Sequence, residues 1–271
     1  MIDLHCHLLP GIDDGPKKIA ESIAMAKIAV KDGIKVIACT PHIYQGIYDN
    51  NAQSIQKAMD AFQKVLHKEG IDLELTYGAD THLHPRLISD IHSGTVPTLH
   101  HSRYLLIEFN HHIVSLFYED YLKEMLKQGF VPIMTHPERL DYIDHFYPTV
   151  TRLIEAGAWA QITASSLTGR FGSKAKRFAM KFLVEGKIAI LATDAHSVKH
   201  RPPILTEGLK VAEAILGKEE ADRLVFDRPR AILDNLETHQ VIPVPFLRES
   251  KFSRHKIQRY FKKIKLDLLL N

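Results

Sequence analysis

The hydrophobic pattern of the chain is a repeat in which a helical stretch ends in a glycine and a short apolar run follows. It occurs five times, as KDG-IKVIACTPH, KEG-IDLELTYGAD, KQG-FVPIMTHPE, EAG-AWAQITA and VEG-KIAILATDAH. Each glycine stands where a helix commonly ends in a left-handed residue. Runs this rich in Val, Ile, Leu and Ala are typical of parallel strands buried on both faces. With MIDLH at the start and YLLIEF at 104–109, they predict seven strands.

The helical stretches alternate with these strands, at about 17–31, 52–69, 85–92, 115–128, 148–156 and 173–185. Regular alternation predicts a parallel α/β fold, either open or closed. Six polar residues lie at or just beyond strand ends: His7, His42, Asp80, Glu108, His136 and Asp194. They favour closure, because the strand ends of a (β/α) barrel all face one bowl. We therefore expect a seven-stranded (β/α)₇ barrel.

The composition adds the expected setting of the protein. A hydrophobic fraction of 45% in 271 residues is enough for a sizeable core. No apolar run reaches about 18 residues, so we expect no transmembrane helix. The first residues lack the features of a secretory signal. Because Cys6 and Cys39 make no disulfide framework, a reduced, cytoplasmic setting is expected.

The end of the chain differs in charge from the rest. Residues 248–271 carry eight lysines and arginines against Glu249 and Asp267, so the net charge of +3 comes from this tail. The prolines of VIPVPF (241–246) predict an extended linker, which divides a barrel at 1–240 from a linker and basic amphipathic helix at 241–271. Such a helix either packs its apolar face on the barrel or a second subunit, or lies on an anionic membrane.

A set of metal-ligand residue types accompanies the predicted strand ends. His5 and His7 are two apart on a strand, so both point to one side and Cys6 to the other. Alone, the pair is also compatible with two hydrogen-bonded core histidines. Seven further residues of ligand type fall at strand ends or in the loops after them: Asp14, His42, Asp80, Glu108, His136, Asp194 and His196. Burying nine such groups is costly without cations, so the pattern predicts a site for two or three divalent ions.

Histidine and carboxylate donors without thiolate fit Zn²⁺, Mn²⁺ or Fe²⁺, and clustered divalent ions suit hydrolysis. Arg139, in HPER, and Arg201, in HSVKHRPP, lie close to ligand candidates. Each alone is also explained by a surface ion pair, but together they favour a phosphoryl substrate over an amide or ester. A cysteine-based phosphatase loop needs an arginine six residues after the cysteine. Ile12 and Gln45 stand at those positions, so that route is excluded.

Several motifs together resemble one known family. They are HCHLLPGIDDG, TPH (40–42), IEF (107–109), HPER (136–139), QITASSLTGRFG (161–172) and TDAH (193–196). The chain is similar over residues 1 to about 240 to the polymerase and histidinol phosphatase (PHP) superfamily. Within it, the chain most resembles bacterial protein-tyrosine phosphatases associated with capsule and exopolysaccharide gene clusters. The resemblance implies a distorted (β/α)₇ barrel with three metal ions, commonly manganese.

The resemblance also implies roles for individual residues. His5, His7, Asp80 and Asp194 would surround the first ion. Asp80 would bridge to a second ion held by Glu108 and His136, and the third would be held by Asp14, His42 and His196. Arg139 and Arg201 match the arginines that hold the phosphate. The family usually has glutamate where this chain has Asp80, and many other branches have histidine at Asp14 and Glu108.

The expected activity is hydrolysis of phosphotyrosine on a membrane-linked bacterial tyrosine kinase that controls capsular polysaccharide synthesis. No nucleic-acid partner is expected, and peripheral membrane contact through residues 248–271 stays an alternative. The alternatives are another metal-dependent phosphoesterase and two more distant rivals, an amidohydrolase-type hydrolase and a weakly active phosphotyrosine-binding regulator. For seven further histidines, a solvated loop position is favoured over proton donation: His82, His84, His100, His101, His111, His112 and His200.

Overall fold

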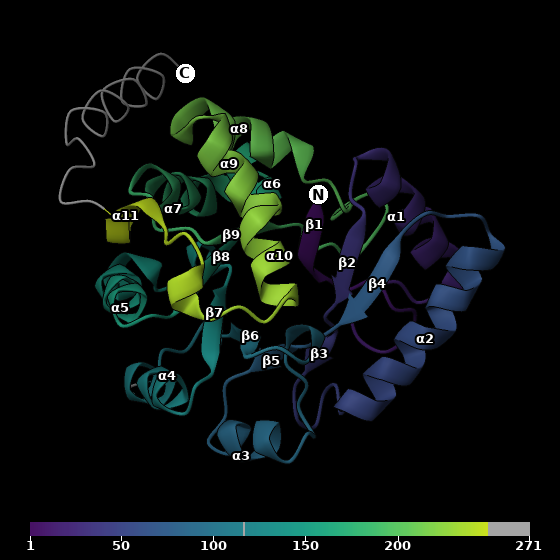
Figure 1. The fold of residues 1–271 in the computed structure, drawn as a ribbon, viewed down its shortest axis with the longest axis horizontal. Coiled ribbons are helices and arrows are strands. Elements are labelled where there is room, and N and C mark those ends of the chain that lie inside the picture. The colour runs from purple at the N-terminus through teal and green to yellow at the C-terminus, as the bar shows by residue number, and fades with distance from the viewer. Residues whose placement is uncertain (116, 249–271) are drawn as a thin grey trace.

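The computed structural model, which describes residues 1–115 and 117–248, contains two sheets of parallel strands (Figure 1). One sheet has the order β1-β2-β4, and the other has the order β3-β5-β6-β7-β8-β9. The strands are β1 Ile2–Cys6, β2 Val36–Cys39, β3 His42–Ile43, β4 Glu74–Tyr77, β5 Asp80–His82, β6 Tyr104–Glu108, β7 Val131–Thr135, β8 Trp159–Thr163 and β9 Ile190–Ala192. The predicted parallel α/β class is therefore confirmed.

Nine described strands replace the seven expected because the second and third predicted strands are each divided in two. The break between β2 and β3 falls at Pro41, which has no N–H to donate to a ladder. The break between β4 and β5 includes Gly78, where an added Cβ would lie 2.8 Å from the Leu99 side chain. Close packing at this glycine interrupts the strand. Each break moves the second half of the strand, with His42 or Asp80 at its start, into the larger sheet.

Among the described residues, strand pairing does not join the two sheets into one closed barrel. Their contact at the open side is made by the segment after β9. The Asp194 N–H donates to the His5 carbonyl at 2.8 Å, and the His7 N–H donates to the Ala195 carbonyl at 2.9 Å. The barrel expectation is thus met in its parallel strands and flanking helices, while closure is limited here to these irregular contacts.

The helices are α1 Ile19–Lys31, α2 Ala52–Lys68, α3 Leu87–His92, α4 Tyr118–Lys127, α5 Ile143–Glu155, α6 Ala164–Thr168, α7 Gly172–Val184, α8 Thr206–Leu216, α9 Lys218–Val225 and α10 Asp227–Leu233. Short 3₁₀ segments lie at η1 Leu99–His101, η2 Pro137–Arg139 and η3 Thr238–Gln240. The predicted start of α5 at 148 is wrong, because buried Ile143 and Phe146 extend its apolar face past Pro148. The glycines of the five repeats have positive φ, as predicted.

The buried apolar side chains form two cores. The larger lies between the strands and the helices that flank them in Figure 1, and it includes Cys6 together with Met25 and Ala29 of α1. The smaller contains side chains from strands of both sheets, such as Leu4 and Leu106, and Ile232 of α10. Cys6 therefore belongs to the helix-facing core, as expected from its position between two histidines.

The segment after η3 packs on the body instead of forming the extended linker expected from its prolines. Val241 and Val244 are buried, and Pro245–Arg248 forms the short helix α11. The Phe246 N–H donates to the Gly186 carbonyl at 3.0 Å. The basic amphipathic helix predicted for the tail lies outside the described residues. In the ranges that are described, no helix has the length and apolar character needed to cross a membrane.

Candidate metal centre

All nine predicted ligands come together in the structure, and they lie in or just after the strands: His5, His7, Asp14, His42, Asp80, Glu108, His136, Asp194 and His196. Their donor atoms form overlapping groups, and the atoms within each group lie within 4.8 Å of one another. Seven of the nine residues are buried, while Asp14 and His42 are more open. The topology therefore joins residues that are up to 191 positions apart in the sequence, which is the separation of His5 and His196.

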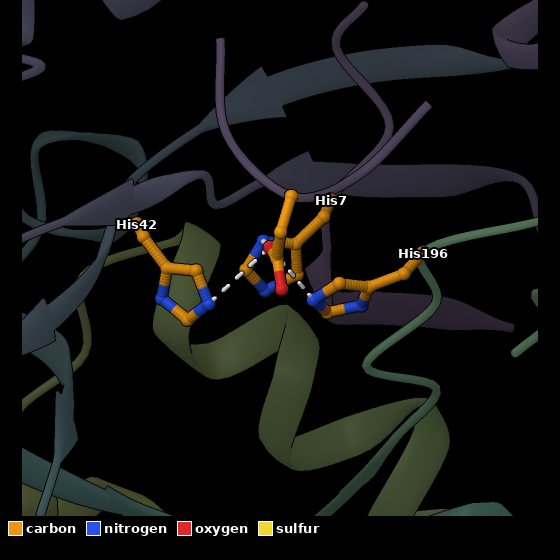
Figure 2. Close-up of side chains that lie close together, drawn as sticks. His7, His42 and His196 are labelled. Atoms are coloured by element: carbon orange, nitrogen blue, oxygen red, sulfur yellow. Dashed lines mark ion pairs between the residues drawn. The ribbon is translucent and has the colours of Figure 1, made fainter. Parts of the chain in front are cut away.

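One group lies at the more open side and contains His7, Asp14, His42 and His196. The Asp14 Oδ1 atom lies 3.5 Å from His42 Nε2 and 3.2 Å from His196 Nε2. The His7 and His196 ring centroids are 3.8 Å apart. Figure 2 shows His42 and His196 on either side of His7, with the dashed ion pairs meeting between them. Four donors from separate segments thus face one small volume.

Asp80 occupies the middle of the cluster. Its Oδ2 atom lies 3.4 Å from His5 Nε2, 3.5 Å from His42 Nδ1 and 4.0 Å from His136 Nε2. Its other oxygen, Oδ1, accepts a hydrogen bond from Thr135 Oγ1 at 3.3 Å. One carboxylate oxygen is therefore fixed by the protein, and the other faces donors from three different groups.

Glu108, at the end of β6, is surrounded by histidines. Its Oε2 atom lies 2.7 Å from His82 Nε2, and its Oε1 atom lies 3.2 Å from His111 Nε2 and 3.7 Å from His136 Nε2. The interpretation of His82 and His111 as solvated loop histidines is therefore wrong. His111 forms a possible ligand group with Glu108 and His136. The sequence gives little signal for these two, because other histidines stand close to them in the sequence, such as His84 and His112.

The cluster fits divalent cations on its own chemistry. Two buried atoms, His42 Nδ1 and Asp80 Oδ2, have no hydrogen-bond partner although they lie only 3.5 Å apart. Buried polar atoms without partners are rare and costly in proteins. A cation accepts both as ligands. The set of imidazoles and carboxylates without thiolate is suited to Mn²⁺, Fe²⁺ or Zn²⁺.

Asp194, another buried carboxylate of the cluster, is held by arginines. Arg139 Nη1 and Arg201 Nη2 both donate to Asp194 Oδ2. Its Oδ1 atom faces the histidines, 3.4 Å from His5 Nε2 and 3.6 Å from His7 Nε2. The ring of Phe171 lies beneath both guanidinium groups, with its centroid 4.3 Å from Arg139 Cζ and 5.6 Å from Arg201 Cζ. Both predicted arginines thus border the ligand cluster.

Two ligand candidates have unusual backbone conformations. His136 has φ of 31° and Asp194 has φ of 50°, which is the left-handed region that side chains other than glycine seldom adopt. Pro137 follows His136 and begins η2, so Arg139 lies within one short turn of a ligand. Strained backbone of this kind is concentrated at functional sites, where the surrounding structure holds it.

The electrostatic environment leaves two histidines neutral. Burial, with His196 and His42 beside it, lowers the pKa of His7 well below its usual value. Burial and Arg139 do the same for the pKa of His136. Neutral rings keep the lone pair that a cation needs. His5 differs: burial opposes its protonation, but Asp80 and Asp194 raise its pKa to about 9.

Glu108 and Asp194 are ionised despite their burial. Burial works against charge on Glu108, but hydrogen bonds from His111 and His82 hold its pKa well below the usual range. Burial likewise opposes charge on Asp194, and Arg201, His5 and Arg139 hold its pKa well below the usual value. The cluster therefore contains the anionic oxygens of Glu108 and Asp194 together with the neutral imidazoles of His7 and His136.

Residues outside the predicted set orient the ligands. The His7 Nδ1–H donates to Asp13 Oδ2 at 2.6 Å, and the His5 Nδ1–H donates to Gln161 Oε1 at 2.9 Å. Partners of this kind fix the ring orientation and tautomer of metal-binding histidines. Gly15 completes the DDG motif, because an added Cβ would lie 2.5 Å from the His7 carbonyl oxygen. Adjacent Asp13 and Asp14 thus serve different histidine atoms, which spacing alone does not separate.

Comparison with known proteins assigns the chain that carries this cluster to a family. The model of the family described as "Capsular polysaccharide synthesis, CpsB/CapC" matches residues 1–234. The chain belongs to the CpsB/CapC family. Every predicted ligand and both arginines lie within the matched residues. The expectation of a PHP-type, capsule-associated branch is confirmed at this level.

Members of the CpsB/CapC family that resemble the chain are tyrosine-protein phosphatases. YwqE of Bacillus subtilis (strain 168) is 34% identical over 252 residues, covering 93% of this chain and 99% of YwqE. CpsB of Streptococcus pneumoniae is 29% identical over 238 residues, covering 86% of this chain and 98% of CpsB.

Solved structures agree at two levels. One, from work on YwqE of B. subtilis and CpsB of S. pneumoniae as metal-dependent tyrosine phosphatases, has a TM-score of 0.84 at 34% identity. It covers 88% of this chain and 96% of that chain. A β-aspartyl dipeptidase of Fervidobacterium islandicum AW-1 has a TM-score of 0.52 at 13% identity, over 86% of this chain and 72% of that one. The second likeness concerns the fold alone.

Proposed function

We propose that this chain is a metal-dependent tyrosine-protein phosphatase. The observation that carries the proposal is the convergence of nine imidazole and carboxylate ligands beside two arginines on one carboxylate, Asp194. The relatives named as tyrosine phosphatases support it, because they match nearly the whole chain. The cluster provides for cations and the arginines provide for a phosphoryl group, which together are the requirements of this hydrolysis.

We assign the ligands to two or three ions, with Mn²⁺ as the expected metal and Zn²⁺ or Fe²⁺ as alternatives. His5, His7, Asp80 and Asp194 would hold the first ion. Asp80, Glu108 and His136 would hold the second, and Asp14, His42 and His196 would hold the third. The proximity of these atoms supports the assignment, and His111 is a further candidate beside Glu108 and His136.

The residues of the chain bind and orient the phosphotyrosine in this proposal. Arg139 and Arg201 each offer a planar fork that suits two phosphoryl oxygens. Their shared contact with Asp194 places both forks beside the ligand cluster. Bound divalent ions supply an acidified water nucleophile and neutralise developing negative charge. The leaving phenol has a pKa near 10, so its departure needs less protonation than an alkoxide does.

The same proposal includes a distorted seven-stranded barrel at 1–240. The hydrogen bonds from β9's following segment to the end of β1 support closure, as does the shared core of side chains such as Leu4, Leu106 and Ile190. The proposed division assigns residues 241–271 to a C-terminal extension. Of these, residues 241–248 pack against the body.

We further propose a phosphorylated, membrane-linked tyrosine kinase as the substrate, and a cytoplasmic enzyme. The family's capsular polysaccharide description supports the context. Free, buried Cys6 and Cys39 are compatible with a reducing compartment. The basic tail at 248–271 offers a route to an anionic membrane. Sedimentation with anionic liposomes, comparing the full chain with residues 1–247, tests this contact, and equal partitioning would refute it.

The direct test of activity is phosphate release from a phosphotyrosine peptide. We expect turnover with Mn²⁺, loss of turnover after chelation, and recovery when the metal is restored. The mechanism would be refuted if exhaustive chelation left the protein free of metal and turnover persisted. The same assay separates the two rivals: a regulator binds the peptide without releasing phosphate, and an amidohydrolase-type enzyme cleaves an amide or ester instead.

A further inference from the structure

A cavity of about 620 Å³ lies beside the metal cluster, and neither the proposed metals nor the phosphate accounts for it. Its walls come from the loop after β3, the segment after β5 and the loop before α4. We call it the aromatic groove and define it by Tyr44, Tyr48, His82, Ile113, Phe117 and Tyr118. A cavity of this size is large enough for one or two side chains of a bound polypeptide.

The inner wall of the aromatic groove is continuous with the metal cluster. The rings of Tyr44 and His82 stack with centroids 3.9 Å apart and an angle of 16°. His82 in turn contacts Glu108, with its Nε2 atom 2.7 Å from Oε2. Tyr48 stacks on His42 with centroids 5.7 Å apart. Two residues that line the groove, His82 and Tyr48, therefore contact ligand candidates of the metal cluster directly.

The outer rim of the groove exposes large apolar side chains. Ile113 is 67% exposed and Phe117 is 38% exposed. Exposed apolar groups that gather at a cavity mark a surface where a partner binds. The charged side chains in the lining are Asp49, Asp90 and Arg86, so acidic groups outnumber basic ones. This balance disfavours a second phosphate, and the exposed apolar side chains of Ile113 and Phe117 favour an apolar ligand group.

We propose that the aromatic groove binds a large apolar side chain of the substrate polypeptide, next to the phosphotyrosine. The inference rests on the proposed phosphatase function and adds a sequence preference to it. An extended chain advances about 3.5 Å per residue, so the bound side chain is within a few residues of the phosphotyrosine. Small aryl phosphates lack this contact and gain nothing from the groove.

The test is binding of peptides that cannot be hydrolysed. Phosphonodifluoromethyl-phenylalanine replaces phosphotyrosine, and a single phenylalanine is moved through the three positions on each side in an alanine background. Affinity for Mn²⁺-loaded protein is measured by fluorescence polarisation. We expect at least one position where phenylalanine binds about tenfold more tightly than alanine, the change expected when one apolar side chain enters a partly enclosed pocket. Equal affinity at every position overturns the proposal.

Substitution at the rim locates the effect. The double variant Ile113→Ser with Phe117→Ser should reduce the phenylalanine preference to about twofold, because both residues are exposed and contribute only apolar surface. Phe226→Ser is the matched control, since Phe226 is 41% exposed and does not line the groove. A preference that survives the double variant, or that Phe226→Ser removes equally, overturns the assignment.

Two further measurements separate other outcomes. If a second copy of the chain covers the groove, light scattering shows a native dimer that the double variant dissociates, and the peptides show no phenylalanine preference. That result overturns the proposal. Phosphate release from the corresponding phosphotyrosine peptides is followed in parallel. Failure of release refutes the proposed function, while the affinity ratios still decide whether the groove binds an apolar side chain.

Discussion

Asp194 and Glu108 are both buried carboxylates of the metal cluster, but different groups hold them. Asp194 receives hydrogen bonds from Arg139 and Arg201. Glu108 lies between His82 and His111. An arginine carries its charge at every accessible pH, whereas a histidine is neutral or charged according to its surroundings. The cluster thus has two permanently charged arginines beside Asp194, whereas histidines stand beside Glu108.

The difference indicates a division of labour across the site. A guanidinium fork binds phosphate as well as carboxylate, so the Asp194 side is suited to the negatively charged end of a substrate. Histidines can orient a carboxylate without fixed positive charge, so they do not repel a metal ion at Glu108. The aromatic groove opens on that side, next to His82. The phosphate and the polypeptide are therefore expected on different sides of the ions.

The largest effect should follow removal of charge at Asp194. Asp194→Asn deprives an ion of an anionic ligand and leaves Arg139 and Arg201 without their shared carboxylate. Breaking a buried ion pair costs about 3–5 kcal/mol, and each 1.4 kcal/mol is tenfold. We expect kcat/KM for a phosphotyrosine peptide to fall about 1,000-fold or more, with reduced metal content by elemental mass spectrometry.

Glu108→Gln is the matched comparison for this prediction. Neither substitution requires a new backbone conformation, because the asparagine of Asp194→Asn tolerates the left-handed conformation of residue 194. We expect the Glu108 variant to lose about 100-fold, because glutamine still offers an oxygen to an ion and the substitution breaks no arginine–carboxylate pair. Equal losses, or a larger loss at Glu108, would contradict the proposed asymmetry.

Smaller effects should distinguish the side chains that contact the two carboxylates, Arg139 at Asp194 and His111 at Glu108. Arg139→Lys keeps the charge but removes the planar fork, so we expect about a 100-fold loss of kcat/KM with a raised KM. His111→Gln keeps a hydrogen-bonding group beside Glu108 and should cost about tenfold or less, chiefly through weaker metal binding. Steady-state kinetics at saturating Mn²⁺ measure both. An unchanged KM in Arg139→Lys would argue against phosphate contact.

The contrast between the two sides also explains what the sequence could predict. Asp194, His136 and Arg139 follow strand ends in short motifs. The repeat locates those strand ends, so the sequence alone is enough to single out the three residues. The parallel α/β class followed from the same repeats. His82 and His111 carry no such signal: His82 reaches Glu108 because β5 pairs with β6 in a register that sets the two residues opposite each other, and His111 reaches it from the segment after β6. The division of a strand at Gly78 also depends on a tertiary contact, that with Leu99.

Phe171 should give the next smaller effect. Its ring lies under Arg139 and Arg201, and cation–π contacts contribute about 0.5–2 kcal/mol. We expect Phe171→Leu to lower kcat/KM about fivefold through KM, because both guanidinium groups lose the surface that positions them. Phe171→Tyr keeps an aromatic face and should restore native kinetics. If the tyrosine variant is as weak as the leucine variant, volume and not the aromatic face explains the loss.

The smallest effect is expected at Asp80, where the resemblance described in the sequence analysis implies a glutamate. The shorter side chain still places Oδ2 within 3.4 Å of His5 Nε2 and 3.5 Å of His42 Nδ1. Asp80→Glu adds a methylene to a fully buried site, where overpacking typically costs about 1–3 kcal/mol. We expect the native chain to be active and the variant to stay within about threefold of it, in phosphate release and in metal titration. A gain of several orders of magnitude would show instead that the native aspartate cannot bridge two ions, and the chain would then act as a weakly active phosphotyrosine-binding regulator.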